Sequence, residues 1–156
     1  MRLITMVQCW ISKIVSGNIT YHNCRIDSVY PHLITIGKNF IAAPGSMITA
    51  HDASLINKTG EMITGRVKVG DNVYLGANAV ILPGVTLGDN VSVAANSLVT
   101  KSFKANVVIG GNPARILMSM EQYIQFAHTN KEKQVQKKEI PGLSNDILAK
   151  NIYTTR

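Results

Sequence analysis

Residues 69–104 read VGDNVY, LGANAV, ILPGVT, LGDNVS, VAANSL and VTKSFK, which are six consecutive hexapeptides in one register. Every unit begins with an aliphatic residue, and its fourth position is Asn or Gly in all units except the last. A period of six fits neither an α-helix, with about 3.6 residues per turn, nor the simple alternation of a long strand. It indicates a very short strand followed by a tight turn, repeated along the chain.

Three such units form one coil of a β-helix, so residues 18 positions apart should stack on each other. The expected stacked pairs are Val69 with Leu87, Leu75 with Val93, and Ile81 with Val99. Asn or Gly at the fourth position supplies the positive φ that a tight corner requires. The repeat therefore predicts an all-β fold, a parallel β-helix of triangular coils over about residues 17–109. Spacing does not give its hand, because the general rule for parallel crossovers is right-handed.

An earlier block, IGKNFI, AAPGSM and ITAHDA at residues 36–53, has the same pattern but breaks at its end. The fourth position of its last unit is His51, where Asn or Gly is expected, and Asp52 follows in a position that is usually small. The step in sequence from Ile36 to Val69 is not a multiple of six, so residues 53–66 must form an inserted external loop. Long irregular loops in compact domains are often functional.

The two ends of the chain lie outside the repeat. Apolar residues spaced three and four apart from Leu3 to Ile14 predict a short amphipathic helix, and a C-terminal helix is expected over about residues 114–128. We expect one domain at 1–130 and a basic tail at 131–156, which accounts for part of the net charge of +7. Aromatics do not alternate with the basic residues, which argues against nucleic acid. Membrane contact is expected only through the N-terminal segment or the tail.

Cysteine usage bears on the compartment. The chain has two cysteines, Cys9 and Cys24, without a C-x-x-C motif, and they are interpreted as reduced thiols of a cytoplasmic protein. No apolar run is long enough to cross a bilayer. A nucleophile–base pair of Cys24 and His22 lacks an orienting third group and is not favoured.

With VVIGGNPARIL at residues 107–117 directly behind the repeats, residues 17–118 resemble the hexapeptide-repeat acyltransferases, in particular their single-domain O-acetyltransferase branch. That branch includes the maltose, galactoside, serine and capsular-polysaccharide acetyltransferases. The resemblance implies a left-handed triangular prism, a homotrimer with active sites between subunits, and acetyl-CoA as co-substrate. It also implies that a histidine deprotonates an acceptor hydroxyl, which then attacks the thioester directly.

Site residues follow from the resemblance position by position. His51 is the candidate general base, a task that imidazole suits near neutral pH, and Asp52 is a candidate for orienting it, contacting substrate or capping the turn. The resemblance places the pantetheine and phosphates of CoA against a further set of residues. These are Tyr74, Ala77, Ala95, Thr100, Lys101 and Arg115.

The acceptor is the least determined part of the prediction. A sugar or a surface-glycan precursor is expected, mainly because the N-terminal segments typical of the maltose, galactoside and serine enzymes are not matched. A serine-like or other small acceptor remains an alternative, as does a non-catalytic hexapeptide-repeat scaffold. A zinc enzyme of the γ-carbonic anhydrase type needs three converging histidines. Only His51 of the four histidines falls in a regular coil, so no metal is expected.

Overall fold

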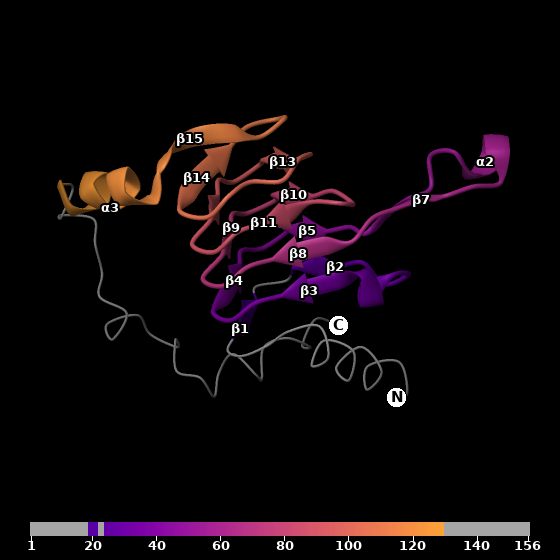
Figure 1. Ribbon diagram of the computed structural model, residues 1–156, viewed down its shortest axis with the longest axis horizontal. Coiled ribbons are helices and arrows are strands. Elements are labelled where there is room, and N and C mark those ends of the chain that lie inside the picture. Colours follow the sequence, from indigo (N-terminus) through magenta and orange to yellow (C-terminus); the bar gives the residue numbers. More distant parts are fainter. Residues whose placement is uncertain (1–18, 22–23, 130–156) are drawn as a thin grey trace.

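The computed structural model describes residues 19–21 and 24–129, and it forms a three-sided β-helix with a projecting hairpin and a C-terminal helix (Figure 1). The helix expected near the N-terminus, Cys9, His22 and the basic tail lie outside the described residues. In the described part no helix has the length and apolar character needed to cross a membrane.

Very short strands stack in register to make the three sides of the coil. The first sheet has the order β1 (Ile19–Tyr21), β4 (Phe40–Ala42), β9 (Tyr74–Leu75), β12 (Ser92–Val93), β14 (Val107–Gly110) and β15 (Arg115–Ser119). The second has the order β13 (Leu98–Val99), β10 (Val80–Ile81), β5 (Met47–Ile48) and β2 (Arg25–Ile26). The third has the order β11 (Thr86–Leu87), β8 (Val67–Val69) and β3 (Ile34–Ile36). All pairings within them are parallel except that of β14 with β15.

The predicted stacking is confirmed. Val69 pairs with Leu87, Leu75 with Val93, and Ile81 with Val99. The earlier block stacks on the same rungs, because Ile36, Ala42 and Ile48 pair with Val69, Leu75 and Ile81. The offset is the same for all three pairs, so the inserted residues between the two blocks leave the register of the coils unchanged.

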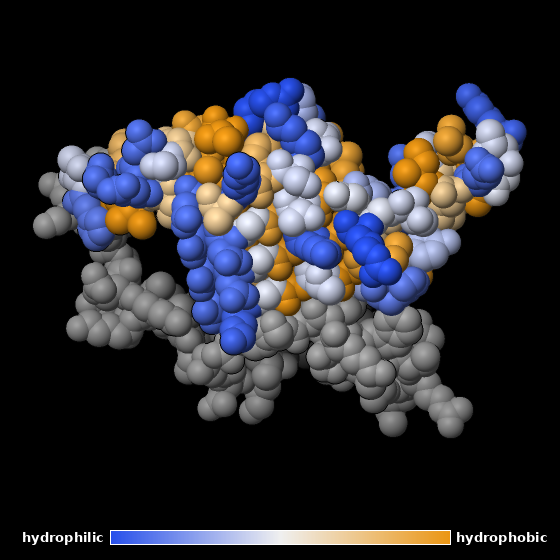
Figure 2. Space-filling model, viewed as in Figure 1, coloured by the Kyte–Doolittle hydropathy of each residue, from blue (hydrophilic) through white to orange (hydrophobic). Residues whose placement is uncertain are grey.

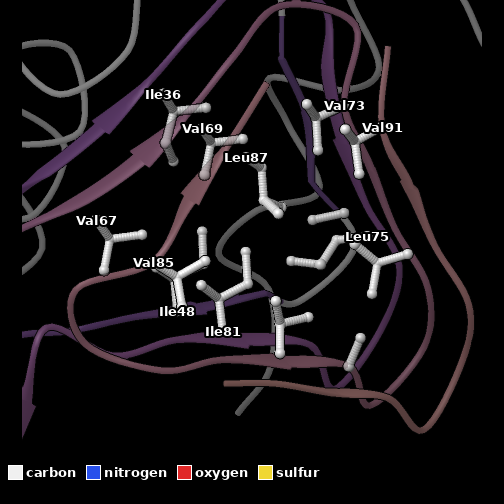
Figure 3. Packing of buried hydrophobic residues seen from close by; sticks show 14 of the residues in the cluster. Ile36, Ile48, Val67, Val69, Val73, Leu75, Ile81, Val85, Leu87 and Val91 are labelled. Carbon is white, nitrogen blue, oxygen red and sulfur yellow. The ribbon is translucent and has the colours of Figure 1, made fainter. Parts of the chain in front are cut away.

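The first position of each repeat fills the interior of the coil. Figure 3 shows these aliphatic side chains pointing inward from all three sides, and Ile48, Leu75, Ile81 and Val93 are completely buried. Small and medium aliphatic side chains suit this narrow space, since each rung buries its residues against the rungs above and below. The interior is a continuous apolar column, so functional groups must lie on its outside.

The corners confirm the role of asparagine. Positive φ angles of 55–57° occur at Asn39, Asn72, Asn78, Asn90 and Asn96, and Gly45 and Gly84 do the same at 75° and 82°. At the corner between the third and first sheets the side-chain amides also form a ladder. Asn39, Asn72 and Asn90 each donate to the next asparagine, ending at Asn106, over 2.9–3.0 Å. Figure 2 shows this corner as a continuous hydrophilic column.

Two of the predicted corners are wrong. His51 does not have positive φ, because the chain leaves the coil there as the extended strand β6 (His51–Asp52) and pairs with β7 (Ile63–Thr64). Ser102, the fourth residue of the last hexapeptide, does not have positive φ either, because the turn from β13 to Phe103 is shorter than the equivalent turn at Gly84. Phe103 consequently pairs with Leu87 after this shorter turn. Asn106, with φ 63°, makes the next corner, the one that Asn90 makes in the preceding coil.

The predicted C-terminal helix begins later than expected. Residues 115–119 form β15, which pairs antiparallel with β14, and α3 (Met120–Thr129) follows. The reason is the open edge of β14, whose unpaired backbone groups accept a further strand. The other helices of the described residues are short: α2 (Ile56–Thr59) in the hairpin and a 3₁₀ turn, η1 (Pro31–Leu33), before β3.

The corner ladder gives a stability prediction at Asn90. Replacing Asn90 by Ala removes two side-chain hydrogen bonds and leaves at φ 55° a residue that lacks the short polar side chain by which Asn tolerates this conformation, so we expect the free energy of unfolding to fall by about 2 kcal/mol. Asn90→Gly keeps the backbone conformation and should lose less. Urea unfolding of both variants measures the difference, and equal losses would contradict a cost from φ.

Candidate active site

His51 stands at the point where the chain leaves the coil. It follows β5 and begins the β6–β7 hairpin, which Figure 1 shows extending away from the body with α2 at its tip. The amide of Gly65 donates to the carbonyl of Ala50 over 3.0 Å and closes the base of the hairpin. The predicted loop at residues 53–66 is therefore an ordered excursion, and His51 lies at its root with a quarter of its side chain exposed.

A buried carboxylate meets His51 from the preceding coil. Nδ1 of His51 lies 2.5 Å from Oδ2 of Asp27, whose side chain has no solvent exposure. The same oxygen accepts the backbone N–H of Ala50 over 2.8 Å, and Oδ1 accepts the N–H groups of Val29 and Tyr30 over 2.8 and 3.0 Å. Both carboxylate oxygens of Asp27 therefore accept two hydrogen bonds each, and one of the four donors is the imidazole.

The environment of Asp27 fixes its charge and the tautomer of His51. Burial alone would raise the pKa of this carboxyl, but the N–H donors of Tyr30 and Ala50, the bond to His51 and the N–H of Val29 outweigh it and lower the pKa from 3.8 to about 2. A carboxylate ionised at neutral pH can only accept, so Nδ1 of His51 must carry the proton. Nε2 is then left with a free lone pair, the arrangement a general base requires.

Asp52 has a different place from the one expected of an orienting residue. Its side chain is fully exposed, and Oδ1 accepts the N–H of Ser54 over 2.8 Å, which caps the start of the loop. The hydrogen bonds of that turn lower the pKa of Asp52. The carboxylate that hydrogen-bonds His51 is that of Asp27.

Sequence reasoning missed Asp27. It lies well before His51 in the chain and follows β2, in a first coil whose register departs from the repeat. Ile26 pairs there with Ile48, whereas the regular spacing would pair it with Pro44. One signal was available, namely an aspartate directly after an apolar strand residue and before the extra residues. Without the register of that coil, nothing in the sequence connects it to His51.

Several candidate site residues lie at one corner of the coil, directly after the strands of the second sheet. Asp27 follows β2, His51 follows β5, and Thr100 and Lys101 follow β13, with the strands in the order β13-β10-β5-β2. Neighbouring strands lie about 4.8 Å apart, so Thr100 and Lys101 stand roughly 10 Å from His51 along the axis. Both are exposed, and Nζ of Lys101 lies 5.7 Å from the ring centroid of Phe103.

The other cofactor candidates lie on the opposite side of the second sheet, at or beyond the ends where its strands begin. Ala77 and Ala95 occupy successive corners between the first and second sheets, where the carbonyl of Ala77 accepts the N–H of Asn96 over 2.8 Å. Tyr74 projects from β9 with 42% of its surface exposed, and Arg115 begins β15 with a guanidinium bond to the carbonyl of Ala114. The structure thus divides the cofactor candidates into two groups, one on each side of the second sheet.

Between these two groups lies the outer face of the second sheet. Met47, Val80 and Leu98 point outward from it, and each is only partly exposed. Among the described residues no group of three His, Cys, Asp or Glu side chains is arranged to hold a metal ion.

Comparisons with known proteins show the family to which the chain belongs. The family model for the bacterial transferase hexapeptide (six repeats) matches residues 66–101. Protein CapG of Staphylococcus aureus is 44% identical over 113 residues, which are 65% of this chain and 66% of CapG. The chain belongs to the hexapeptide-repeat transferases. Galactoside O-acetyltransferase of Escherichia coli K12 is 38% identical over 68% of this chain and 54% of its own.

Solved structures of two O-acetyltransferases share the fold. A maltose O-acetyltransferase from Clostridium difficile 630 has a TM-score of 0.57 at 29% identity, with 76% of each chain covered. The polysialic acid O-acetyltransferase OatWY has a TM-score of 0.56 at 33% identity, covering 67% of this chain and 52% of its own. The chain spans between about half and two thirds of the length of the first curated relatives it matches.

Proposed function

We propose that this chain is an acetyl-CoA-dependent O-acetyltransferase that acetylates a hydroxyl of a sugar or surface-glycan precursor, with His51 as the general base. The observation that carries the proposal is the Asp27–His51 hydrogen bond, which leaves Nε2 of a partly exposed imidazole free to accept a proton. The names of the relatives support the reaction class, since several are acetyltransferases and two act on galactoside or polysialic acid.

The chemistry needs a single base. Nε2 of His51 removes the proton of the acceptor hydroxyl as its oxygen attacks the thioester carbonyl, the C–S bond breaks, and the imidazolium returns its proton to the departing thiolate. The products are an acetyl ester and CoA. No covalent enzyme intermediate is required, because holding both substrates beside one base supplies much of the rate. Asp27 stabilises the imidazolium that forms in this step.

The residues on the two sides of the second sheet suit acetyl-CoA as the co-substrate. Ala77 and Ala95 carry small side chains at successive corners, which permit close approach of an extended pantetheine. Lys101 and Arg115 are exposed cations at the C-terminal coils and suit the phosphates of CoA. Tyr74 and Thr100 complete the set that we assign to CoA.

We further propose a left-handed coil and a cytoplasmic homotrimer whose active sites lie between subunits. The hairpin supports the trimer, because Leu55, Ile56 and Ile63 expose 39%, 42% and 48% of their surfaces, and Figure 2 shows hydrophobic surface on it. Apolar groups gathered on a projecting hairpin suit contact with a neighbouring subunit. A protomer that stays monomeric in analytical ultracentrifugation would argue against a shared site.

Ligand-dependent stability tests the co-substrate assignment. Acetyl-CoA at about 100 times its Kd should stabilise the protein by roughly 2.7 kcal/mol, seen as a rise in Tm in a thermal-shift assay. Arg115→Ala should weaken that rise, whereas Lys38→Ala, which removes an exposed cation at the remote corner, should not. The absence of any rise at millimolar acetyl-CoA would favour a non-catalytic scaffold.

A further inference from the structure

The residues inserted in the first coil form a structured turn beside His51. Ile26 pairs with Ile48 instead of Pro44, so this coil holds four more residues than a regular one. The extra length includes η1 and the turn before it, where the N–H groups of Val29 and Tyr30 both donate to Oδ1 of Asp27. Oδ2 of the same carboxylate accepts from His51. One buried group thus fixes this turn and the imidazole relative to each other.

The inserted turn places an aromatic ring against the candidate base. The ring centroids of Tyr30 and His51 lie 5.6 Å apart with planes inclined at 59°, and His32 packs edge-on against Tyr30 with ring centroids 6.0 Å apart. Tyr30 is half-buried and rests partly on the hydrophobic core, so its ring is held in place rather than free to rotate into solvent. It forms a rigid wall next to the partly exposed imidazole.

The strand order puts this wall on the side of His51 away from the co-substrate residues. Along the corner after the second sheet, the turn with Tyr30 belongs to the β2 coil, His51 to the β5 coil, and Thr100 and Lys101 to the β13 coil. A base that passes a proton from an acceptor to a thiolate must lie between the two substrates. If CoA occupies the C-terminal side, the acceptor must approach His51 from the side of Tyr30.

We propose that Tyr30 is a specificity-determining residue that binds the acceptor, and that the acceptor is a pyranose whose C–H face lies on the tyrosine ring. The inference rests on the proposed function and goes beyond it by naming the wall and the shape it selects. An aromatic face attracts C–H groups through its quadrupole and buries apolar area. A pyranose offers such a face with hydroxyls around its rim, and stacking it on Tyr30 directs a rim hydroxyl toward Nε2 of His51. A small acyclic alcohol has no comparable face.

The test separates acceptor binding from the chemistry of the base. Acetyl-CoA, a panel of methyl pyranosides, and the acyclic alcohols glycerol and serine are used as probes, and acetyl-CoA hydrolysis by water is followed without acceptor. We expect transfer to at least one pyranoside. Tyr30→Leu should raise the KM for that pyranoside about tenfold or more, while hydrolysis stays within about twofold of wild type. Tyr30→Phe keeps the ring and should change KM by less than about threefold.

The control is Tyr123→Leu, which removes an exposed tyrosine from α3, away from His51, and should leave every rate unchanged. An unchanged pyranoside KM in Tyr30→Leu, or equal losses in transfer and hydrolysis, would overturn the proposal, since the ring would then not touch the acceptor. The proposal would also be overturned if hydrolysis depended on His51 but no pyranoside were acetylated. That result would leave His51 as the proposed base. If the wild-type protein catalysed neither transfer nor hydrolysis, that result would count against the proposed function itself.

A second measurement does not depend on the leucine variant folding. The ¹⁹F resonance of fluorotyrosine at position 30, identified by its absence from Tyr30→Phe, should shift on titration with the accepted pyranoside and not with glycerol. A resonance that stays fixed at saturating pyranoside would contradict contact with the ring.

Discussion

Replacing His51 by Ala should lower kcat for acetyl transfer by about 10²–10⁴-fold, the range that a positioned general base contributes. The variant should retain its β-helix, because His51 lies outside the apolar column and begins the hairpin rather than a coil strand. Steady-state kinetics, with release of free thiol as the readout, measures the effect. Turnover near that of the wild type would remove His51 from the mechanism.

A second variant separates the base from the packing. His51→Ala leaves Asp27 without one of its four donors, which by itself could disturb the site. His51→Asn places an amide N–H near the position of Nδ1 and keeps a donor for Asp27 while removing the base. Both variants should lose activity to the same degree, whereas His128→Ala, at the exposed end of α3, should lose none. A large recovery in the Asn variant would point to packing instead.

Replacing Asp27 by Asn should damage both activity and stability. The amide would turn an N–H toward the N–H of Ala50 or toward Nδ1 of His51, so one donor would lose its acceptor and the imidazole its fixed tautomer. We expect kcat to fall by about 100-fold or more. We also expect the free energy of unfolding at pH 7 to fall by about 2–3 kcal/mol, measured by urea denaturation.

The pH dependence gives the sign of the Asp27 contribution. Its pKa is lowered to about 2 in the folded protein, so the carboxylate stabilises the fold above the unfolded pKa of about 3.9. That stabilisation is lost as the pH falls toward 2. The stability difference between wild type and Asp27→Asn should therefore shrink between about pH 4 and pH 2. Asp89→Asn, at an exposed corner carboxylate, should show a much smaller difference throughout, and a pH-independent gap for Asp27→Asn would contradict the lowered pKa.

Much of the fold could be predicted because the repeat is a local code. The aliphatic first position and the Asn or Gly corner are read within six residues, and stacking then follows from adding 18. The predictions failed where the backbone found a partner outside the repeat. His51 left its corner to pair with Thr64, and residues 115–119 became a strand because β14 offered an open edge.

The candidate site divides in the same way. His51 could be found from the sequence, since it replaces a corner residue and begins an insertion that breaks the register. Its partner could not, because Asp52 is adjacent in the chain but points to Ser54, whereas Asp27 is distant in the chain and adjacent in space. Tyr30 was invisible for the same reason, since its place beside His51 depends on how the extra residues of the first coil fold.

The sequence by itself thus determined the coil, its inward residues, its asparagine corners and the position of the histidine, because each depends on a pattern a few residues long. Only the tertiary structure decided which carboxylate orients that histidine, which ring stands beside it, and on which sides of it the Tyr30 turn and the proposed co-substrate residues lie. Those relations join residues of different coils, and an irregular insertion sets the register between the first two coils. Contacts across such a register depend on the packing of the whole stack.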